Sequence, residues 1–274
     1  MAEEFTMIPI FPRQHLARAT AVGLIPFVLH GFSRAAAVNG QLFEHQPQRA
    51  WLENYDPTLV SSRLFSEFSF ENHDNDAHYY KVETTLRWGI PLRDGLALGL
   101  QVMVPVKWNE TATSDDSGIG DLELRTGIVG RISPTLRYGI GLNAAFDTAS
   151  AAALGDHAFV LRPITSIRWD VTDRINLGLN LEYNFTPFDE GAKDVSALEL
   201  KFPLVLKLSE AWSAAITYKP KWNFLTDTDQ HRLELGATRQ WGSDNQYALS
   251  FGTEAPLSAE NFNFKLITGF AWYF

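Results

Sequence analysis

Residues 136–147 read Leu-Arg-Tyr-Gly-Ile-Gly-Leu-Asn-Ala-Ala-Phe-Asp, and apolar and polar positions alternate along the stretch. A period of two places alternate residues on opposite faces of an extended β-strand, whereas helical spacing would scatter them around an axis. One face carries Leu136, Tyr138, Ile140, Leu142, Ala144 and Phe146, and the other carries Arg137, Gly139, Gly141, Asn143, Ala145 and Asp147. The stretch therefore predicts a strand with one apolar and one polar face.

The same alternation recurs from about residue 59 to the end of the chain. It predicts twelve strands, centred near residues 65, 85, 101, 125, 142, 165, 180, 201, 218, 236, 250 and 268. Short turns such as 133–135 alternate with longer, polar loops such as 149–157. An even number of strands with this alternation of turns and loops is typical of outer-membrane barrels. We therefore expect an all-β fold, a transmembrane antiparallel up-and-down β-barrel with short periplasmic turns and longer extracellular loops.

The placement of the aromatic residues separates a membrane barrel from the alternative, a soluble β-barrel or sandwich. Amphipathic rings concentrate at the two membrane–water interfaces, and a soluble core has no reason to sort them by depth. At the short-turn ends of strands lie Trp88, Trp169, Trp212, Trp241 and Trp272. At the long-loop ends lie Phe68, Phe70, Tyr80, Phe146, Phe159, Tyr183, Phe185, Trp222, Phe224, Phe262 and Phe264. Mostly aliphatic residues lie between the two groups, which favours the membrane barrel.

The last strand carries a second indication. Its apolar face is predicted to hold Phe262, Phe264, Leu266, Phe270, Trp272 and Phe274. This ending resembles the signal by which barrel-assembly machinery recognises its clients, so we expect that machinery, acting through Phe274, and outer-membrane lipid to be partners of the chain. The expected location is the bacterial outer membrane.

Composition limits the other possibilities. The chain has 274 residues and no cysteine, which excludes disulfides, thiolate metal sites and cysteine nucleophiles. Its net charge of −9 argues against a general nucleic-acid binder, which would present a basic surface. After residue 37 no uncharged apolar run approaches the ~20 residues that a membrane helix needs.

The N-terminal region reads as an export signal. The apolar run 19–29 follows Arg13 and Arg18 and precedes Ala35-Ala36-Ala37, which is the order of regions in a secretory signal peptide. A buried N-terminal helix is the alternative. Translation can start at Met1 or at Met7. The predicted organisation is a signal peptide over residues 1–37, a periplasmic leader or plug over 38–58, and the barrel over 59–274.

If the apolar face meets lipid, the polar face lines the lumen. A slip of one residue would move its charges into lipid, at ~2–4 kcal/mol for each Lys or Arg near the midplane, so the register is well determined. The predicted inward face holds more basic than acidic residues. As pore-lining residues we predict Arg87, Arg125, Arg137, Arg162, Arg168, Lys201, Lys207, Lys219, Lys221, Asp121 and Glu123.

These inward charges have two interpretations. Opposite charges on neighbouring strands can pair and hold the barrel in shape. Alternatively, unpaired basic residues create a field that favours anionic solutes, as charged rings do in pores. The lysines at 201, 207, 219 and 221 have only Glu199 close by in sequence, which makes this patch the best candidate for a selective wall.

No catalytic pattern stands out. A lipid hydrolase needs a nucleophilic Ser or Thr beside a His base, and no histidine lies in such an arrangement on a predicted lipid-facing strand. The sequence contains no Gly-x-Ser-x-Gly, His-Glu-x-x-His or phosphate-loop motif. We therefore expect neither enzymatic activity nor a metal or other cofactor.

The segment Ser-Gly-Ile-Gly-Asp-Leu at 117–122 opens the fourth predicted strand, and Gly-Leu-Asn-Ala-Ala-Phe-Asp-Thr follows at 141–148. Together with the closing hairpin, from Thr217-Tyr218-Lys219-Pro220 onward, these residues resemble the outer-membrane transporter family labelled "MetA-pathway of phenol degradation". The resemblance spans about residues 80–274. It implies a twelve-stranded barrel that passes small hydrophobic or aromatic compounds, with Gly118, Gly120 and Asp121 as its motif.

The sequence thus predicts an outer-membrane channel for passive uptake of small solutes. The lumen charges favour anionic compounds, whereas the family resemblance favours aromatic ones. An outer-membrane lipid-modifying enzyme and a closed structural or adhesive barrel are the alternatives.

Overall fold

The computed structural model describes residues 58, 61–111, 114–187, 194–260 and 262–274. The predicted signal peptide (1–37) and all but the last residue of the predicted leader or plug (38–58) lie outside the described residues. The strands are β1 (Arg63–His73), β2 (His78–Arg93), β3 (Leu96–Glu110), β4 (Asp115–Ile119), β5 (Glu123–Ser133), β6 (Leu136–Ala145), β7 (Val160–Thr172), β8 (Ile175–Phe185), β9 (Ser196–Lys207), β10 (Trp212–Asn223), β11 (Thr228–Trp241), β12 (Tyr247–Pro256) and β13 (Phe262–Tyr273).

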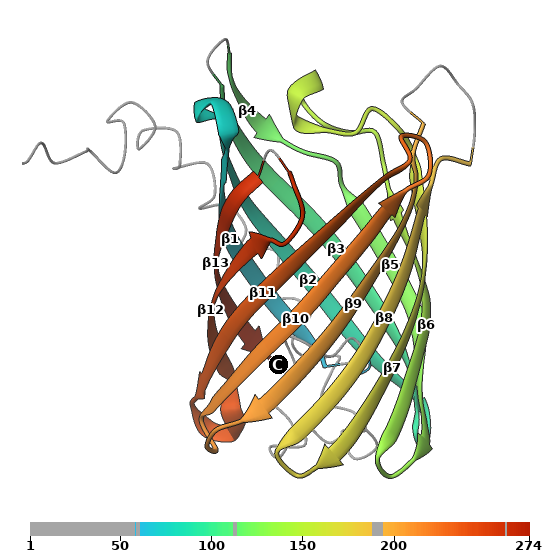
Figure 1. Cartoon of the computed structure of the whole chain (residues 1–274). Helices are drawn as coiled ribbons and strands as arrows, with labels where there is room; N and C mark the ends of the chain where they lie inside the picture. Colours follow the sequence, from blue (N-terminus) through green and yellow to red (C-terminus); the bar gives the residue numbers. More distant parts are fainter. Residues whose placement is uncertain (1–57, 59–60, 112–113, 188–193, 261) are drawn as a thin grey trace, which may run out of the picture. The chain divides into compact units, whose positions relative to one another are not determined.

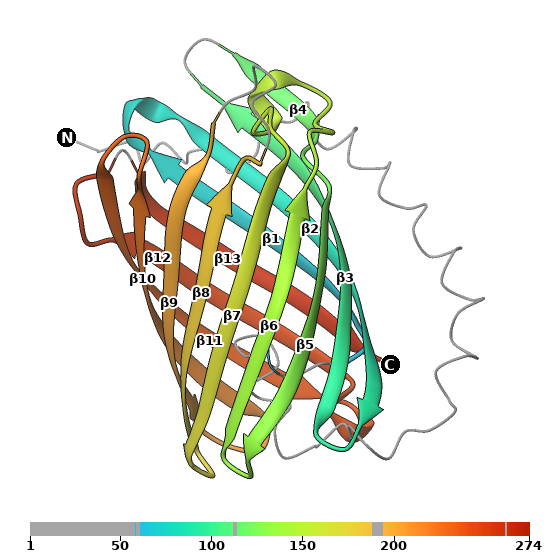
Figure 2. The same cartoon turned by 90° about the vertical axis from the view of Figure 1, so that its right-hand side faces the viewer.

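The strands form one closed antiparallel barrel (Figure 1). Sequential strands pair around the wall, and β1 pairs with β13 from Arg63↔Tyr273 to His73↔Phe262, which closes it. Both β4 and β5 pair with β3, so together they take one position in the wall. The barrel therefore has the twelve predicted positions, and the fourth predicted strand is interrupted at Gly120–Leu122. Figure 2 shows β4 at the long-loop end of the wall.

The two faces of the wall carry the predicted residue types. Large aliphatic side chains lie exposed on the outside, including Leu124, Ile140 and Leu235, of which Ile140 is 61% exposed. Charged side chains such as Arg87 and Arg168 lie buried on the inside. A soluble monomer rarely exposes contiguous apolar surface of this extent, because water disfavours it. The polarity is that of a barrel in a lipid bilayer, and the predicted fold class, a transmembrane antiparallel barrel, is confirmed.

Aromatic rings contact one another at both ends of the outer wall. At the short-turn end, the rings of Trp241 and Tyr247 stack with their centroids 6.0 Å apart. At the long-loop end, Phe70 contacts Tyr80 at 5.1 Å between centroids. Such pairs strengthen cross-strand packing beyond the area that they bury.

Phe262 does not lie on the outer face where the alternation predicted it. The pairing of β1 with β13 shifts between Asn72 and His73, and Phe262 is 2% exposed. The Arg232 guanidinium lies 4.5 Å from the centroid of its ring. The β-bulge changes which face the residue presents, so strict alternation ends there.

Helical structure is limited, in the part of the chain that the structure describes, to three 3₁₀ turns: η4 (Asp74–Asp76), η5 (Ala152–Leu154) and η6 (Ser243–Asn245). No helix among the described residues is long and apolar enough to cross a membrane.

Candidate functional site

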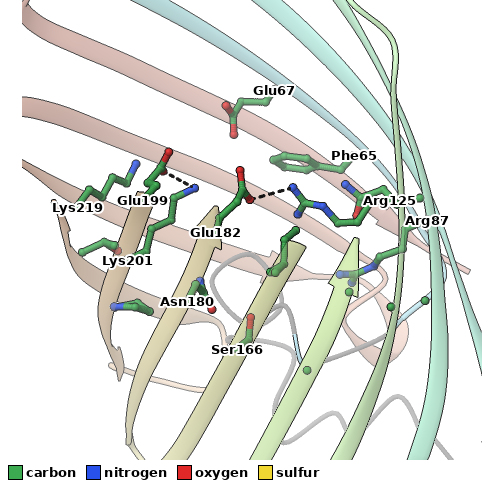
Figure 3. A pocket seen from close by; sticks show the side chains of 18 of the residues that line it. Phe65, Glu67, Arg87, Arg125, Ser166, Asn180, Glu182, Glu199, Lys201 and Lys219 are labelled. Atoms are coloured by element: carbon green, nitrogen blue, oxygen red, sulfur yellow. Dashed lines mark ion pairs between the residues drawn. The ribbon is translucent and has the colours of Figure 1, made fainter. Parts of the chain in front are cut away.

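The barrel encloses a cavity of about 420 Å³. Six basic side chains line it, namely Arg63, Arg87, Arg125, Lys201, Lys219 and Lys265, together with five acidic ones, Glu67, Glu182, Glu199, Glu234 and Glu254. Figure 3 shows several of these side chains pointing into the same space from different strands. Twelve strands enclose an interior between the filled lumen of eight-stranded barrels and the aqueous channel of sixteen-stranded porins. The cavity is therefore polar and nearly balanced in charge.

A network of ion pairs lies on the inner face of β10, β11 and β12, and every charged side chain in it has an opposite charge as partner. Lys219 forms ion pairs with Glu234 and, at 2.7 Å, with Glu254. Glu254 is also 3.2 Å from Arg232, which reaches Glu260 at 2.7 Å. Each of these side chains is less than one third exposed, so their opposite charges neutralise one another in a partly desolvated setting.

The predicted lysine patch is divided among different partners. Lys201 lies 3.0 Å from Glu199, and Lys207 lies 2.7 Å from Glu210 in the turn that follows β9. Lys219 belongs to the network described above. Among the described residues, Lys221 alone of the four lacks an ion pair, although it lies opposite Glu199 in the register. The patch is therefore not a uniform row of free cations.

Arginines concentrate toward the short-turn end of the inner wall. Arg131, Arg137 and Arg168 lie directly opposite one another across β5, β6 and β7. Arg137 is 3.3 Å from Asp170, which also accepts a 2.8 Å hydrogen bond from Asn176. The Arg168 side chain is fully buried and covers Gly178, where a Cβ would collide with the guanidinium. Arg137 and Arg168 thus lie against the wall and do not line the cavity.

Two further predicted residues bind each other above the cavity. Glu123 on β5 accepts a 2.8 Å hydrogen bond from Arg162 on β7 and a 2.7 Å bond from Asn143 on the strand between them. Arg125, the next inward residue of β5, is held differently. Within the described residues it has one ion pair, to Glu182 on β8, which is 3.8 Å long, and its side chain is 35% exposed.

Asp121 lies at the break between β4 and β5, where it holds a loop. Its Oδ1 accepts hydrogen bonds from the backbone N–H groups of Thr148 (3.1 Å) and Ala149 (3.0 Å), and its Oδ2 accepts one from Asp156 (2.7 Å). The carboxylate is 7% exposed and is not among the residues that line the cavity. The motif residue Asp121 therefore fixes the loop between β6 and β7 to the rim.

The two motif glycines make room for that loop. A Cβ at Gly118 would collide with the Ser150 hydroxyl, and one at Gly120 would lie 3.0 Å from the Leu154 carbonyl oxygen. Lys107 donates a 2.8 Å hydrogen bond to the same oxygen. Leu154 is 1% exposed. The sequence motif of two glycines and an aspartate thus corresponds to a packed loop contact.

The described residues that precede β1 lie inside the short-turn end of the barrel. Thr58 is 5% exposed, and its methyl group would lie 3.6 Å from a Cβ at Gly139 on β6. Arg87 donates hydrogen bonds to the Ser61 carbonyl oxygen (3.0 Å) and to the Ser61 hydroxyl (2.8 Å). These contacts narrow the lumen on this side and engage a predicted pore-lining arginine.

The histidine rings do not form a hydrolytic arrangement in the described part of the chain. The Nδ1 atom of His231 forms a 2.8 Å hydrogen bond with the Tyr218 hydroxyl, and its Nε2 atom lies 2.8 Å from Oδ2 of Asp229. His157 contacts the Ala152 carbonyl oxygen. No ring nitrogen of a described histidine bonds to a Ser or Thr hydroxyl, and the described part of the chain holds no cluster of three or more potential metal ligands.

Sequence reasoning missed the small and apolar part of the cavity lining. Gly99, Gly127, Gly141, Phe65 and Ile267 line it beside the charges. Their signal was present, since each falls on the inward parity of its strand. The predicted pore lining names only charged residues, whereas glycine shapes the lining by removing side-chain volume from one part of the wall.

Comparisons with known proteins place this geometry among outer-membrane barrels. The fold is similar to "Crystal structure of the COG4313 outer membrane channel from Pseudomonas putida F1", with a TM-score of 0.68 and 15% sequence identity over 78% of this chain and 96% of that chain. It is similar to the NanC porin, with a TM-score of 0.55 and 9% identity over 76% and 98%. For the KdgM porin the TM-score is 0.51, with 13% identity over 77% and 99%. No protein-family profile and no curated protein sequence matches the chain. At these identities the likeness establishes a shared fold, the twelve-position outer-membrane barrel.

Proposed function

We propose that the protein is a passive channel of the bacterial outer membrane for small polar solutes, with a preference for anions. The main support for this function is the 420 Å³ cavity, which is lined from opposite walls by charged side chains inside a closed barrel. An apolar exterior and a charged interior are what a solute path across a bilayer requires.

The preference for anions rests on the unequal engagement of the inward charges. Most inward carboxylates are bound to a lysine or arginine at 3.3 Å or less, as Glu254 is by Lys219 and Glu123 is by Arg162. Arg125 and Lys201 keep 35% and 38% of their side chains exposed. Basic groups that remain accessible attract anions and raise their local concentration.

Membership of the family labelled "MetA-pathway of phenol degradation" is part of this proposal. Its support is the glycine–aspartate motif at 117–122 and the fold shared with an outer-membrane channel from Pseudomonas putida F1. We also propose that barrel-assembly machinery recognises Phe274. The exposed phenyl ring of Phe274, whose centroid lies 5.3 Å from that of Trp272, is available for such a contact.

Conductance in planar lipid bilayers tests the channel. Purified protein should give discrete current steps, and a KCl gradient should give a reversal potential of the sign for Cl⁻ preference. Liposomes that contain the protein should swell in small sugars and in small organic acids. Absence of both conductance and swelling, with a folded barrel in the same vesicles, would contradict the proposal and favour a closed structural barrel.

A further inference from the structure

A row of glycines crosses the inner face of the wall. In the register, Gly89 on β2 is opposite Gly99 on β3, Gly99 is opposite Gly127 on β5, and Gly127 is opposite Gly141 on β6. A Cβ at Gly127 would lie 2.9 Å from the Ile140 carbonyl oxygen, and one at Gly141 would lie 2.6 Å from that of Thr126. Only glycine fits where these two backbones approach so closely. The row leaves a strip of backbone without side chains, the floor, of which Gly99, Gly127 and Gly141 line the cavity.

The neighbouring inward row holds three arginines, two of which are engaged. Its members are Arg87, Gln101, Arg125, Asn143 and Arg162, each opposite the next across β2, β3, β5, β6 and β7. Arg87 is held by Ser61 and Arg162 by Glu123. Arg125 is in the middle of the row, next to the glycine floor.

The Arg125 guanidinium makes no hydrogen bond within the described residues. Its Nε is buried without a partner, and its ion pair with Glu182, at 3.8 Å, is longer than a hydrogen bond. The Glu182 carboxylate likewise makes no hydrogen bond in the described part of the chain. Figure 3 shows the two side chains pointing toward one another across the cavity. A guanidinium has five N–H donors in a planar fork that matches a carboxylate, so Arg125 has unused capacity for an anion.

We propose that Arg125 is the binding residue for the carboxylate of small organic acids with a flat apolar body, which lies on the floor formed by Gly99, Gly127 and Gly141. This inference rests on the proposed channel function and names its solute class. The bound carboxylate displaces Glu182 from the guanidinium.

The rest of the cavity suits such a body. Phe65 and Ile267 add apolar surface beside the eleven charged side chains of the lining. A cavity of about 150 Å³ in another protein is sufficient for benzene. The 420 Å³ available here holds a one-ring carboxylate together with water. A flat ring contacts bare backbone closely, whereas a branched or bulky body contacts it poorly, because dispersion contacts fall steeply with separation.

Glu182 acts as an internal competitor in this arrangement. Its carboxylate approaches the same guanidinium that the solute uses. Glu182→Gln removes the competing charge, so it strengthens solute binding, while Arg125→Gln removes the site. A purely structural ion pair would respond to both changes in the same direction, by destabilising the barrel.

The experiment measures benzoate binding to the full-length chain, purified and folded in detergent micelles, by isothermal titration calorimetry. Arg125→Gln should weaken binding by about tenfold or more, as expected for loss of a charge-assisted bidentate contact. Glu182→Gln should strengthen binding by several fold. Arg131→Gln is the matched control, because Arg131 lies on the same strand and face, is exposed, and does not line the cavity. It should leave binding unchanged.

Neutral benzamide tests the need for the charge and should bind at least about tenfold more weakly than benzoate. The site is refuted if Arg125→Gln binds benzoate as the unchanged protein does, or if Arg131→Gln loses binding equally. It is also refuted if Glu182→Gln weakens binding. The two proposals can fail separately. Benzoate binding without conductance would support the Arg125 site and contradict the channel function. Conductance without benzoate binding would support the channel function and contradict the Arg125 site.

Discussion

Two parts of the inner wall hold their charges in different ways. On the paired wall, formed by Lys219, Arg232, Glu234, Glu254 and Glu260, every charged group contacts at least one opposite charge. On the open wall, formed by Gly99, Gly127, Gly141 and Arg125, the glycines carry no side chains. The arginine there forms one ion pair among the described residues, to Glu182 at 3.8 Å.

The difference separates a structural role from a functional one. Partly buried charges that satisfy one another stabilise the barrel but attract little from outside, because their fields cancel at short range. A cation with unused donors contributes little to stability and remains available to a solute. The charges of the paired wall should therefore contribute to stability, and the charge of the open wall should contribute to selectivity.

Loss of the central lysine should have the largest effect on stability. Lys219→Met leaves Glu234 without its lysine and weakens the neutralisation of Glu254, whose side chain is 6% exposed. We expect the free energy of unfolding, measured by urea titration in lipid vesicles, to fall by about 3 kcal/mol. Lys221→Met is the control, since Lys221 has no ion pair within the described residues, and its cost should stay below ~0.5 kcal/mol. Equal losses in the two variants would remove the basis for a paired wall.

Filling the glycine floor should have the next largest effect. Gly141→Ala forces a methyl group to within 2.6 Å of the Thr126 carbonyl oxygen, so β5 and β6 must separate. We expect a loss of about 2 kcal/mol in the same titration, in the range of overpacked sites. Gly139→Ala on the same strand and face places its Cβ at ordinary distances of 3.4 to 3.6 Å from its neighbours, and it should be nearly neutral. A neutral Gly141→Ala would mean that the floor does not require bare backbone.

The rim above the open wall can be tested through Asp121. Asp121→Asn replaces one carboxylate oxygen with an NH₂ donor, so the hydrogen bonds that either Oδ1 or Oδ2 now accepts are lost, while the remaining oxygen can keep its own. We expect a loss of about 1.5 kcal/mol and faster amide hydrogen exchange at Thr148, Ala149 and Asp156. Asp115→Asn changes an exposed rim carboxylate and should alter neither. Unchanged exchange in Asp121→Asn would show that the loop is held by other contacts.

The smallest effect on stability is expected at Arg125. Because its guanidinium makes no hydrogen bond within the described residues, Arg125→Gln should change the free energy of unfolding by less than ~0.5 kcal/mol. The same variant should shift the reversal potential toward equal permeability of K⁺ and Cl⁻. If Arg125→Gln lowered the free energy of unfolding as much as Lys219→Met does, Arg125 would be a structural residue and the proposed difference between the two walls would be wrong.

The alternation of residue types was sufficient to predict the fold. In a strand, successive side chains take opposite faces, so the pattern at 136–147 determines which residues meet lipid and which face inward. The even number of positions and the alternation of turn lengths follow from the same pattern. The exceptions are local: β4 and β5 replace one predicted strand, and Phe262 is displaced by a bulge.

The alternation of residue types could not predict which inward charges form ion pairs with one another. Lys219 has no acidic neighbour on its own strand, and its partners lie on β11 and β12. Arg125 and Glu182 are far apart in the sequence and meet across β6 and β7. In the row that ends at Glu182, these two strands place Gly141, which has no side chain, and Ile164. Asp121 has the inward parity of its strand, yet it contacts loop backbone that no alternation describes.

The amino-acid sequence by itself determined the sheet, its two faces and its closure in a bilayer, because these depend on a period of two that every strand repeats. Only the tertiary structure decided which charges are neutralised and which stay accessible, because that depends on the reach of side chains across two or more strands and on the small residues between them.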